Sequence, residues 1–230
     1  MLCVRTPKAA SNQQKQMESV KHFALSAQKI QEAETYLSQS SEIIAKLVTV
    51  HSPCSIADDE FLPFQTLATS IINQQLSAKA ADTIKQRVLA ILSSFTPAGF
   101  LAVPTDSLRS AGLSSAKSRY LIELAQRVSD GRLDFDEMLC QNDEIVITEL
   151  IELPGIGRWT AEMFLIFGLR RPDVLALGDA GLKRATRLLY GEDADLASVG
   201  QSWRPYRSVA SWYLWRYLDT QPSSQHSLNV

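Results

Sequence analysis

The sequence predicts an all-α fold for a chain of 230 residues. Apolar side chains recur at helical spacing in nearly every segment after the first 30 residues, and no convincing β-strand alternation occurs. Only 10 glycines and 9 prolines are present, which argues against a turn-rich β-sandwich, a collagen-like chain or a low-complexity protein. The hydrophobic fraction of 45% is ordinary for a globular protein and sufficient for one large domain or two small lobes.

The predicted helices follow one another along the chain, and the first covers residues 28–50. Its apolar residues, including Ile30, Leu37 and Ile44, share one helical face. A segment with prolines and acids interrupts the pattern at residues 51–63. The later helices are expected at residues 64–75, 78–94, 115–129, 143–152, 158–168, 180–190 and 204–219, with short helices joined by Pro and Gly turns between 95 and 114.

The net charge of −2 is unevenly distributed along the chain. The first 30 residues carry +4, residues 31–150 carry −7 and residues 151–230 carry +1. The first stretch is also rich in Ser and Gln, and it predicts a basic flexible tail over residues 1–27. This tail is either a solvated terminus or an arm for targeting or DNA contact. The total charge alone argues mildly against DNA as a ligand.

The cysteine and histidine patterns argue against a disulfide framework and against a protein-bound transition metal. Cys3, Cys54 and Cys140 are scattered and odd in number, and the three histidines are equally dispersed. We expect no secretory signal, because the N-terminus lacks the apolar middle stretch of one, and no apolar run approaches the roughly 20 residues that cross a bilayer. We therefore expect an intracellular protein without membrane association, in the cytoplasm or nucleoid of a bacterium or in the nucleus of a eukaryote.

The segment IELPGIGRWTAEMFLIFG, residues 151–168, predicts two helices joined by a tight turn. Pro154 ends the first helix, and Gly155 and Gly157 allow backbone angles and a close approach that a β-carbon would prevent. The second helix begins near Arg158, so its unpaired N–H groups form an anion site that suits a DNA phosphate. An ordinary helix–turn–helix corner is the alternative interpretation.

Backbone carbonyl groups face the same turn. Those of Ile151, Leu153 and Ile156 are candidates to hold a monovalent cation, Na⁺ or K⁺, between the protein and a phosphate. No other cofactor is expected.

Four motifs resemble those of the helix-hairpin-helix (HhH-GPD) DNA glycosylases and follow one another along the chain in the same order as in that family. The hairpin LPGIGRWTA is followed by DVLALGDAGLKRA, in which Asp179 lies 22 residues after Gly157, and a Gly/Pro-Asp at about this interval is the family's signature. SIINQQLSAKAADTI and WRPYRSVASWYLW resemble two further blocks of the branch that acts on alkylated bases, the 3-methyladenine DNA glycosylases II. The resemblance covers residues 30–219, most of the chain.

The resemblance implies a two-lobed fold with the active site in the cleft between the lobes. The central lobe takes about residues 64–168, and the second combines residues 28–63 with 169–222, leaving a C-terminal tail at 223–230. The chain lacks the cysteine cluster of the iron–sulfur members. It also lacks the N-terminal β-domain of the larger bacterial alkylation enzymes, which fits the compact subgroup.

Asp179 immediately precedes a predicted helix, where a carboxylate commonly serves as the N-cap. The resemblance identifies it as the family's catalytic aspartate, and the two roles are compatible because the positive end of a helix stabilises a negative charge. The carboxylate would stabilise an oxocarbenium-like sugar or accept a proton from the attacking water. Asp173, the neighbouring acid, is expected at the surface, and Arg207 is expected to support the active-site helix.

The resemblance places Trp159, Met163 and Trp215 in the base pocket, although both tryptophans would also suit a core. Alkylated purines carry a positive charge, so electron-rich rings can select them by stacking and cation–π attraction. Met163 and Ala180 stand where some members carry tyrosines, which makes this pocket less aromatic. Because Trp159 occupies the position of the lysine nucleophile of strand-cleaving members, we expect simple hydrolysis and an abasic product.

Further DNA contacts are expected on both sides of the hairpin. Gln75 and Leu76 are candidates for the wedge that fills the gap left by an extruded nucleotide, and Ser77 is a candidate for a minor-groove contact. The alternatives are a core position for Leu76 and a helix cap for Ser77. Thr160 and Lys183 are candidates for phosphate contacts beside the glycines.

The sequence therefore predicts a monomeric, monofunctional glycosylase. It is expected to excise 3-methyladenine and 7-methylguanine from double-stranded DNA in base excision repair. A glycosylase for other lesions, such as ethenoadenine or hypoxanthine, and a non-catalytic DNA-binding hairpin module are the two alternatives.

Overall fold

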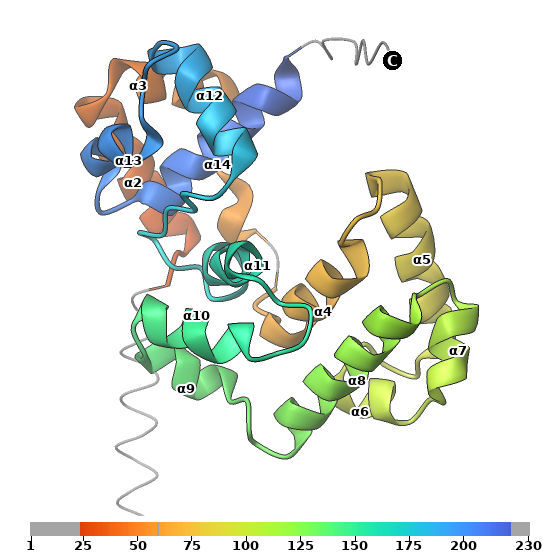
Figure 1. Ribbon diagram of the computed structural model, residues 1–230. Helices are drawn as coiled ribbons and strands as arrows, with labels where there is room; N and C mark the ends of the chain where they lie inside the picture. The colour runs from red at the N-terminus through yellow and green to blue at the C-terminus, as the bar shows by residue number, and fades with distance from the viewer. Residues whose placement is uncertain (1–23, 59, 222–230) are drawn as a thin grey trace, which may run out of the picture. The chain divides into compact units, whose positions relative to one another are not determined.

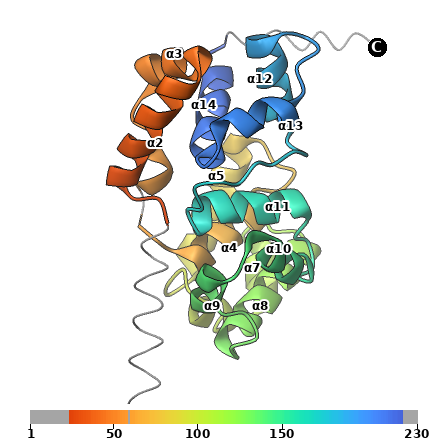
Figure 2. The ribbon, with the colours of Figure 1, turned by 90° about the vertical axis from the view of Figure 1, so that its left-hand side faces the viewer.

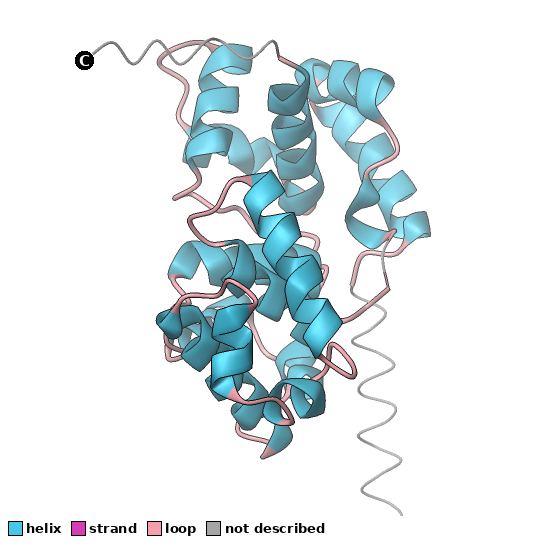
Figure 3. Ribbon diagram, turned by 90° about the vertical axis from the view of Figure 1, so that its right-hand side faces the viewer, coloured by secondary structure: helices cyan, strands magenta, loops and turns pink. Residues whose placement is uncertain are grey.

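The computed structural model describes residues 24–58 and 60–221. All regular structure within these ranges is helical, which confirms the predicted fold class (Figure 3). The described helices include none that is long and apolar enough to span a membrane. The predicted tails at residues 1–27 and 223–230 lie outside the described residues, except for residues 24–27.

The chain divides into two compact units after Glu60 and after Leu169. Unit 1 contains Phe61–Leu169, and unit 2 combines Leu25–Glu60 with the residues from Arg170 on. The sequence places the corresponding boundaries at residues 63/64 and 168/169. Each unit has its own buried core.

Unit 1 is a bundle around α4 and α8, which lie next to each other (Figure 1). Apolar residues of both helices, among them Leu67, Ile71 and Leu121, are fully buried together with Phe100 and Phe164. The unit contains α4 (Pro63–Asn73), α5 (Ala78–Ile91), α6 (Pro97–Leu101), α7 (Thr105–Ser110), α8 (Ser115–Ser129), α9 (Phe135–Cys140), α10 (Asp143–Ile151), α11 (Arg158–Met163) and a π-helical turn, η2 (Phe164–Gly168).

Unit 2 packs α2 and α3 against α14, which also contacts α12 (Figure 2). Trp203 and Tyr213 are its largest fully buried side chains. The unit contains α2 (Ala27–Ser40), α3 (Glu42–His51), α12 (Ala180–Tyr190), α13 (Leu196–Val199) and α14 (Arg207–Thr220), with short 3-10 turns η1 (Ser55–Ala57) and η3 (Gly200–Trp203).

A buried carboxylate ties the two ends of unit 2 together. Glu34 of α2 accepts hydrogen bonds from the Tyr213 hydroxyl at 2.5 Å and from the Cys54 amide at 2.8 Å. Burial raises the pKa of the Cys54 thiol to about 12, and it also raises that of the Tyr213 hydroxyl. Segments on both sides of unit 1 in the sequence are thereby joined in one core.

The structure corrects the predicted helix at residues 28–50, which is two helices. Ser41 has an extended backbone, and its hydroxyl accepts a hydrogen bond from the Ile44 amide, so it ends α2 and caps α3. The expected tail boundary at residue 27 is also wrong. Leu25 is buried, and Ser26 caps α2.

The predicted helix at residues 158–168 changes its winding after Met163. The Leu169 amide donates to the Phe164 carbonyl at 2.9 Å, five residues back, which is the hydrogen bond of a π-turn. A β-carbon on Gly168 would lie 2.5 Å from the Phe164 ring, so glycine allows this turn to close.

Candidate nucleic-acid interface and active site

The predicted hairpin forms as a tight turn between α10 and α11 in unit 1. The Ile156 amide donates to the Leu153 carbonyl at 3.1 Å, and both of these side chains are buried beneath the turn. Gly155 and Gly157 are exposed, and Gly155 has a φ of +85°, a conformation that glycine adopts without strain. Buried apolar side chains thus anchor the turn and leave its glycine backbone on the surface.

Gly157 is the N-cap of α11, and no side chain caps this helix end. The guanidinium of Arg158 is held by two carboxylates instead of pointing to a ligand. It donates to Glu144 at 2.6 and 3.1 Å and to Glu162 at 3.1 Å, and its proximity lowers the pKa of Glu144. A phosphate contact requires a side chain at the surface. Thr160 is buried, with only 7% of the residue exposed, so the structure does not place its side chain there.

Among the candidate cation ligands, Ile151 is the last residue of α10, and Leu153 and Ile156 lie in the turn that follows it. The Leu153 carbonyl already accepts one hydrogen bond and retains a second lone pair, as any carbonyl does. Neutral carbonyl oxygens are hard ligands of the kind that alkali cations take. No group of three His, Cys, Asp or Glu residues suited to a metal is present in the described part of the chain.

The candidate wedge lies at the sharp turn between α4 and α5. Gln75 is exposed and has a φ of +56°, which is strained for a residue with a β-carbon. Leu76 is half-buried and is therefore not a core residue. Ser77 caps α5 by accepting a hydrogen bond from the Ala80 amide at 3.4 Å.

A hydrogen bond joins the wedge turn to the hairpin within unit 1. The side-chain amide of Gln74 donates to the Gly155 carbonyl at 2.8 Å. The sequence places the two motifs 81 residues apart and gives no signal of this contact. The structure thus brings two of the predicted DNA-binding segments together.

The base-pocket candidates of unit 1 lie on α11. Trp159 is 50% exposed, so the alternative interpretation of this residue as core is wrong. Met163 follows one helical turn later on the same face and is half-buried.

Asp179 lies in unit 2 as the N-cap of α12 and is 7% exposed. Its Oδ1 atom accepts hydrogen bonds from the Leu182 amide at 2.7 Å and from the Trp215 indole N–H at 3.1 Å. The capping role expected from the sequence is therefore confirmed. Trp215, half-buried on α14, holds the same carboxylate oxygen, so the structure brings these two predicted site residues into direct contact.

Gly181 is a site residue that the sequence reasoning missed. A β-carbon at this position would lie 3.1 Å from Asp179 Oδ1 and 3.4 Å from Trp215 Cδ1. The distance to Asp179 Oδ1 is tighter than most real β-carbon contacts, whereas the distance to Trp215 is an ordinary van der Waals contact, so glycine leaves room for the carboxylate. The available signal was a glycine in the first turn of a segment that otherwise favours a helix, because glycine lowers helix stability relative to alanine.

The loop before Asp179 is fixed by an ion pair. Arg207 donates to Asp173 Oδ1 at 2.7 Å and Oδ2 at 3.0 Å, and Arg204 adds a contact with Oδ2 at 3.2 Å. Arg207 also donates to the Asp173 carbonyl at 2.6 Å. Arg207 therefore supports the loop that leads to Asp179, and the expectation of a merely surface Asp173 is wrong.

The predicted site residues thus fall on both units. Asp179, Lys183 and Trp215 belong to unit 2, and Lys183 is exposed on α12. The remaining candidates belong to unit 1.

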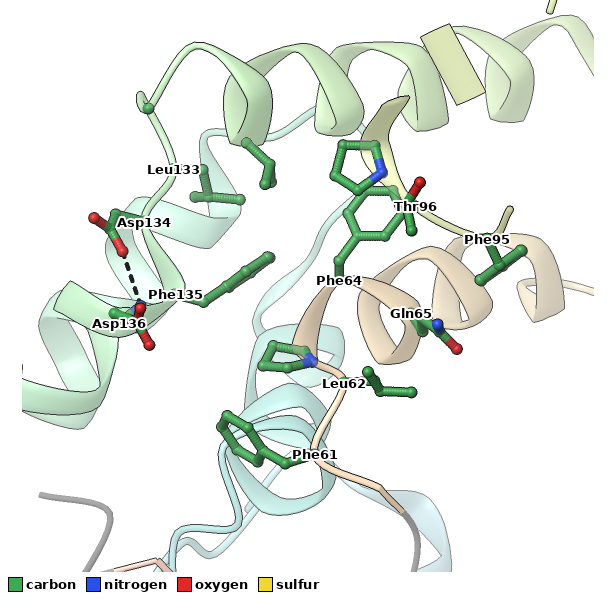
Figure 4. A pocket seen from close by; sticks show the side chains of 14 residues that line it. Phe61, Leu62, Phe64, Gln65, Phe95, Thr96, Leu133, Asp134, Phe135 and Asp136 are labelled. Atoms are coloured by element: carbon green, nitrogen blue, oxygen red, sulfur yellow. Dashed lines mark hydrogen bonds between the residues drawn. The ribbon is translucent and has the colours of Figure 1, made fainter. Parts of the chain in front are cut away.

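A cavity of about 490 Å³ in unit 1 lies apart from all of these residues. Figure 4 shows it lined by aromatic side chains, with Phe61, Phe64, Phe95 and Phe135 around it and the carboxylates of Asp134 and Asp136 at one side. None of the predicted site residues lines this cavity.

Comparison with known proteins matches residues 68–201 to the family of HhH-GPD superfamily base excision DNA repair proteins. DNA-3-methyladenine glycosylase 1 of Schizosaccharomyces pombe is 30% identical over 163 residues, which cover 67% of this chain and 72% of that protein. The chain spans 60% of the length of a Bacillus subtilis relative and 92% of that of a second S. pombe relative.

Two solved structures resemble the fold closely. A DNA-3-methyladenine glycosidase from Bacillus halodurans has 37% identity and a TM-score of 0.69, over 82% of this chain and 89% of that one. The S. pombe 3-methyladenine DNA glycosylase Mag1, solved in complex with abasic DNA, has 29% identity and a TM-score of 0.68, over 82% and 97%. With the hairpin, the capped aspartate and the helical fold in place, this chain belongs to the HhH-GPD superfamily of base excision DNA repair proteins.

Proposed function

We propose that this protein is a monofunctional DNA glycosylase that hydrolyses the N-glycosidic bond of flipped-out alkylated purines and leaves an abasic site. The observation that carries the proposal is the Asp179 carboxylate, fixed at the N-terminus of α12 by Leu182 and Trp215. The names of the relatives, 3-methyladenine glycosylases from yeasts and bacteria, support the same substrate class.

Asp179 would act on the sugar. Departure of the base leaves positive charge on C1′ and the ring oxygen, and a fixed carboxylate stabilises that charge without reorganising during the reaction. Both hydrogen bonds reach Oδ1, so the side chain is held in one rotamer. The same carboxylate can accept the proton that the attacking water releases.

The base would be selected by charge and stacking. Purines alkylated at N3 or N7 already carry a positive charge, so they leave without a general acid. Trp159, Met163 and Trp215 offer aromatic and polarisable surface for such a cation. Trp159 cannot form a Schiff base, so the reaction would end at the abasic site.

DNA would be held by both predicted contact segments of unit 1. The exposed glycine backbone of the hairpin accommodates a phosphate, and the carbonyls of Ile151, Leu153 and Ile156 would hold Na⁺ or K⁺ against it. Gln75 and Leu76 would fill the gap left by the extruded nucleotide. Lys183 would add a phosphate contact from unit 2, and the protein would act as a monomer on double-stranded DNA.

Replacing Asp179 with Asn tests the catalytic role. Asparagine caps helices as well as aspartate does and still accepts both hydrogen bonds, so Asp179→Asn removes the charge and keeps the fold. Excision from a 7-methylguanine duplex should fall by about a hundredfold or more. DNA affinity, measured by fluorescence anisotropy, and the urea unfolding midpoint should be retained. Equal excision by the variant and the wild type would rule out the catalytic role of Asp179.

A panel of duplexes with one lesion each tests the substrate class. Release of 3-methyladenine or 7-methylguanine supports the proposal, whereas release of only ethenoadenine or hypoxanthine would assign the enzyme to other lesions. The same duplexes, incubated without heat or alkali, should remain unbroken at the abasic site, because strand cleavage needs a nucleophile that position 159 does not supply.

A further inference from the structure

The turn that carries Gln75 and Leu76 begins where α4 ends without a cap of its own. The last carbonyls of a helix lack partners within it, and α4 ends at Asn73. The ammonium of Lys117 donates to the Ile72 carbonyl at 2.8 Å and to the Gln74 carbonyl at 2.5 Å. A side chain from a distant helix thus completes the end of α4.

Lys117 stands where helix electrostatics do not favour a cation. Its own amide is bound by the Ser114 hydroxyl that caps α8, so the lysine lies in the first turn of that helix. Positive charge is unfavourable at a helix N-terminus and favourable at a helix C-terminus. The cation is therefore matched to the carbonyl end of α4 and not to its own helix. Burial lowers the pKa of Lys117, because the ammonium is partly withdrawn from water.

The same face of α8 also supports the hairpin. Tyr120 follows Lys117 by three residues, and a β-carbon on Gly155 would lie 2.3 Å from the Tyr120 ring. The Gly155 carbonyl accepts the hydrogen bond from Gln74, the residue whose own carbonyl binds Lys117. Lys117 therefore links helix α8 to the wedge turn, and Gln74 links the wedge turn to the hairpin.

The conformation held by this linkage is strained. Gln75 has a φ of +56°, a left-handed conformation that a residue with a β-carbon rarely adopts. Such a conformation persists only where its surroundings over-determine it. The two carbonyls bound by Lys117 belong to the residues on the N-terminal side of Gln75, and the Leu76 amide on the other side donates to the Asn73 carbonyl at 3.3 Å.

We propose that Lys117 is a positioning residue, which holds the turn of residues 73–77 in the shape that presents Gln75 and Leu76 to DNA and keeps that turn in register with the hairpin through Gln74. The inference rests on the proposed function, because it takes Gln75 and Leu76 as the wedge. Lys117 acts through the turn and touches neither base nor sugar. Two of the three N–H donors of its ammonium bind carbonyl groups, so the proposal assigns it to the turn and not to a phosphate.

Two variants and a control test this role. Lys117→Met removes the ammonium and keeps the length of the side chain, and Gln74→Leu breaks the link to the hairpin while leaving the lysine in place. Lys46→Met, at an exposed position on α3 of unit 2, is the control for the loss of one positive charge.

The first measurement is amide hydrogen exchange without DNA. Lys117→Met should speed exchange at residues 75–77 by about tenfold or more, because the turn opens locally more often. Gln74→Leu should affect Gly155 and its neighbours, and Lys46→Met should affect neither segment. Unchanged exchange at residues 75–77 in Lys117→Met would overturn the proposal. This readout needs no excision, so it decides the positioning role even if the protein excises no base.

The second measurement separates positioning from phosphate contact. In single-turnover excision with saturating enzyme, Lys117→Met should slow the reaction by roughly 10- to 100-fold, as expected for a misplaced contact group. The slope of log K against log salt for DNA binding should stay at its wild-type value. A slope smaller by about 0.9 would instead make Lys117 a direct phosphate ligand and overturn the proposal. Lys117→Arg, which keeps the charge and can donate to both carbonyls, should recover part of the rate.

Discussion

At the scale of single residues, Asp179 combines two duties in one carboxylate. Its Oδ1 atom closes the first turn of α12 and receives the indole N–H of Trp215. A capping aspartate typically contributes about 1 kcal/mol to protein stability, so the cap fixes the position of the carboxylate before any substrate binds. The structural duty thus prepares the catalytic one, since a group already fixed pays no cost of reorganisation in the transition state.

Replacing Gly181 with alanine should reduce activity without reducing stability. Alanine in the first turn of α12 improves helix propensity, so Gly181→Ala should not lower the urea unfolding midpoint. Its β-carbon would press on Asp179 Oδ1, and excision should fall by about tenfold. Gly178→Ala is the control, because a β-carbon there meets nothing within 4 Å. Full activity of Gly181→Ala would mean that the carboxylate position is not critical.

At the scale of elements, the hairpin separates support from contact. Leu153 and Ile156 are buried, and the two exposed glycines have different reasons to lack a side chain. Gly155 needs its positive φ and the space in front of Tyr120, whereas a β-carbon on Gly157 would meet no protein atom within 4 Å. Gly155 is therefore required by the fold, whereas the space in front of Gly157 is free for a ligand.

The two glycines should respond differently to alanine. Gly155→Ala should lower the free energy of unfolding by roughly 1–2 kcal/mol or more, since it combines a left-handed backbone with a clash. Gly157→Ala should leave the unfolding midpoint unchanged and weaken DNA binding, because the added methyl group keeps a phosphate from the N-terminus of α11. Urea denaturation and fluorescence anisotropy check the two effects. Normal DNA affinity of Gly157→Ala would place the phosphate elsewhere.

The surroundings of Glu149 on α10 should make stability depend on pH. Burial and the nearby charges of Glu137, Glu152 and Asp134 raise the pKa of Glu149 on α10 above its ordinary value of 4.5. The folded protein therefore binds a proton more readily than the unfolded chain, and the ionised side chain reduces stability once the pH exceeds 4.5.

Glu149→Gln should consequently raise the free energy of unfolding at pH 7 by a few tenths of a kcal/mol, after screening by solvent. The gain should shrink as the pH falls through the raised pKa and vanish below 4.5, where Glu149 is protonated in both states. Urea unfolding at pH 7 and at pH 3.5 measures both values. Glu192→Gln, at an exposed position, controls for the loss of a charge. An equal gain at both pH values would contradict the electrostatic explanation.

At the scale of the whole molecule, a net charge of −2 is compatible with DNA binding, although the total alone argues mildly against it. Backbone N–H groups at a helix end attract a phosphate without adding to the formal charge. The guanidinium of Arg158 beside the hairpin is bound by the carboxylates of Glu144 and Glu162, so its positive charge is already balanced within the protein.

DNA binding should therefore depend only weakly on salt. With three to five phosphate contacts, the slope of log K against log salt should lie at about −3 to −4.5. Anisotropy titrations of an abasic duplex between 50 and 300 mM KCl, roughly the range in which such slopes are linear, provide the measurement. A slope near −8 or steeper, approximately that of a protein with about nine contacts, would mean that extended basic surface and not the hairpin dominates binding.

Much of the fold and part of the site could be predicted from the sequence because they are local. The helices at residues 115–129 and 180–190 have the predicted bounds, and Ser77 and Asp179 cap the helices they precede. Periodicity, capping residues and glycine at tight turns act over a few residues, so the order of amino acids alone reports them. Ser41 was missed because a serine inside an apolar pattern can either continue a helix or end it.

The sequence by itself thus determined the helical class, the hairpin and the capped aspartate of this protein. Only the tertiary structure decided that Trp215 holds Asp179, that Arg207 fixes the preceding loop through Asp173, and that Lys117 and Gln74 join the wedge turn to the hairpin. These partners lie 34 to 81 residues apart. Contacts of this kind arise from the packing of helices against one another, and no pattern within a single helix specifies which distant side chain it will contact.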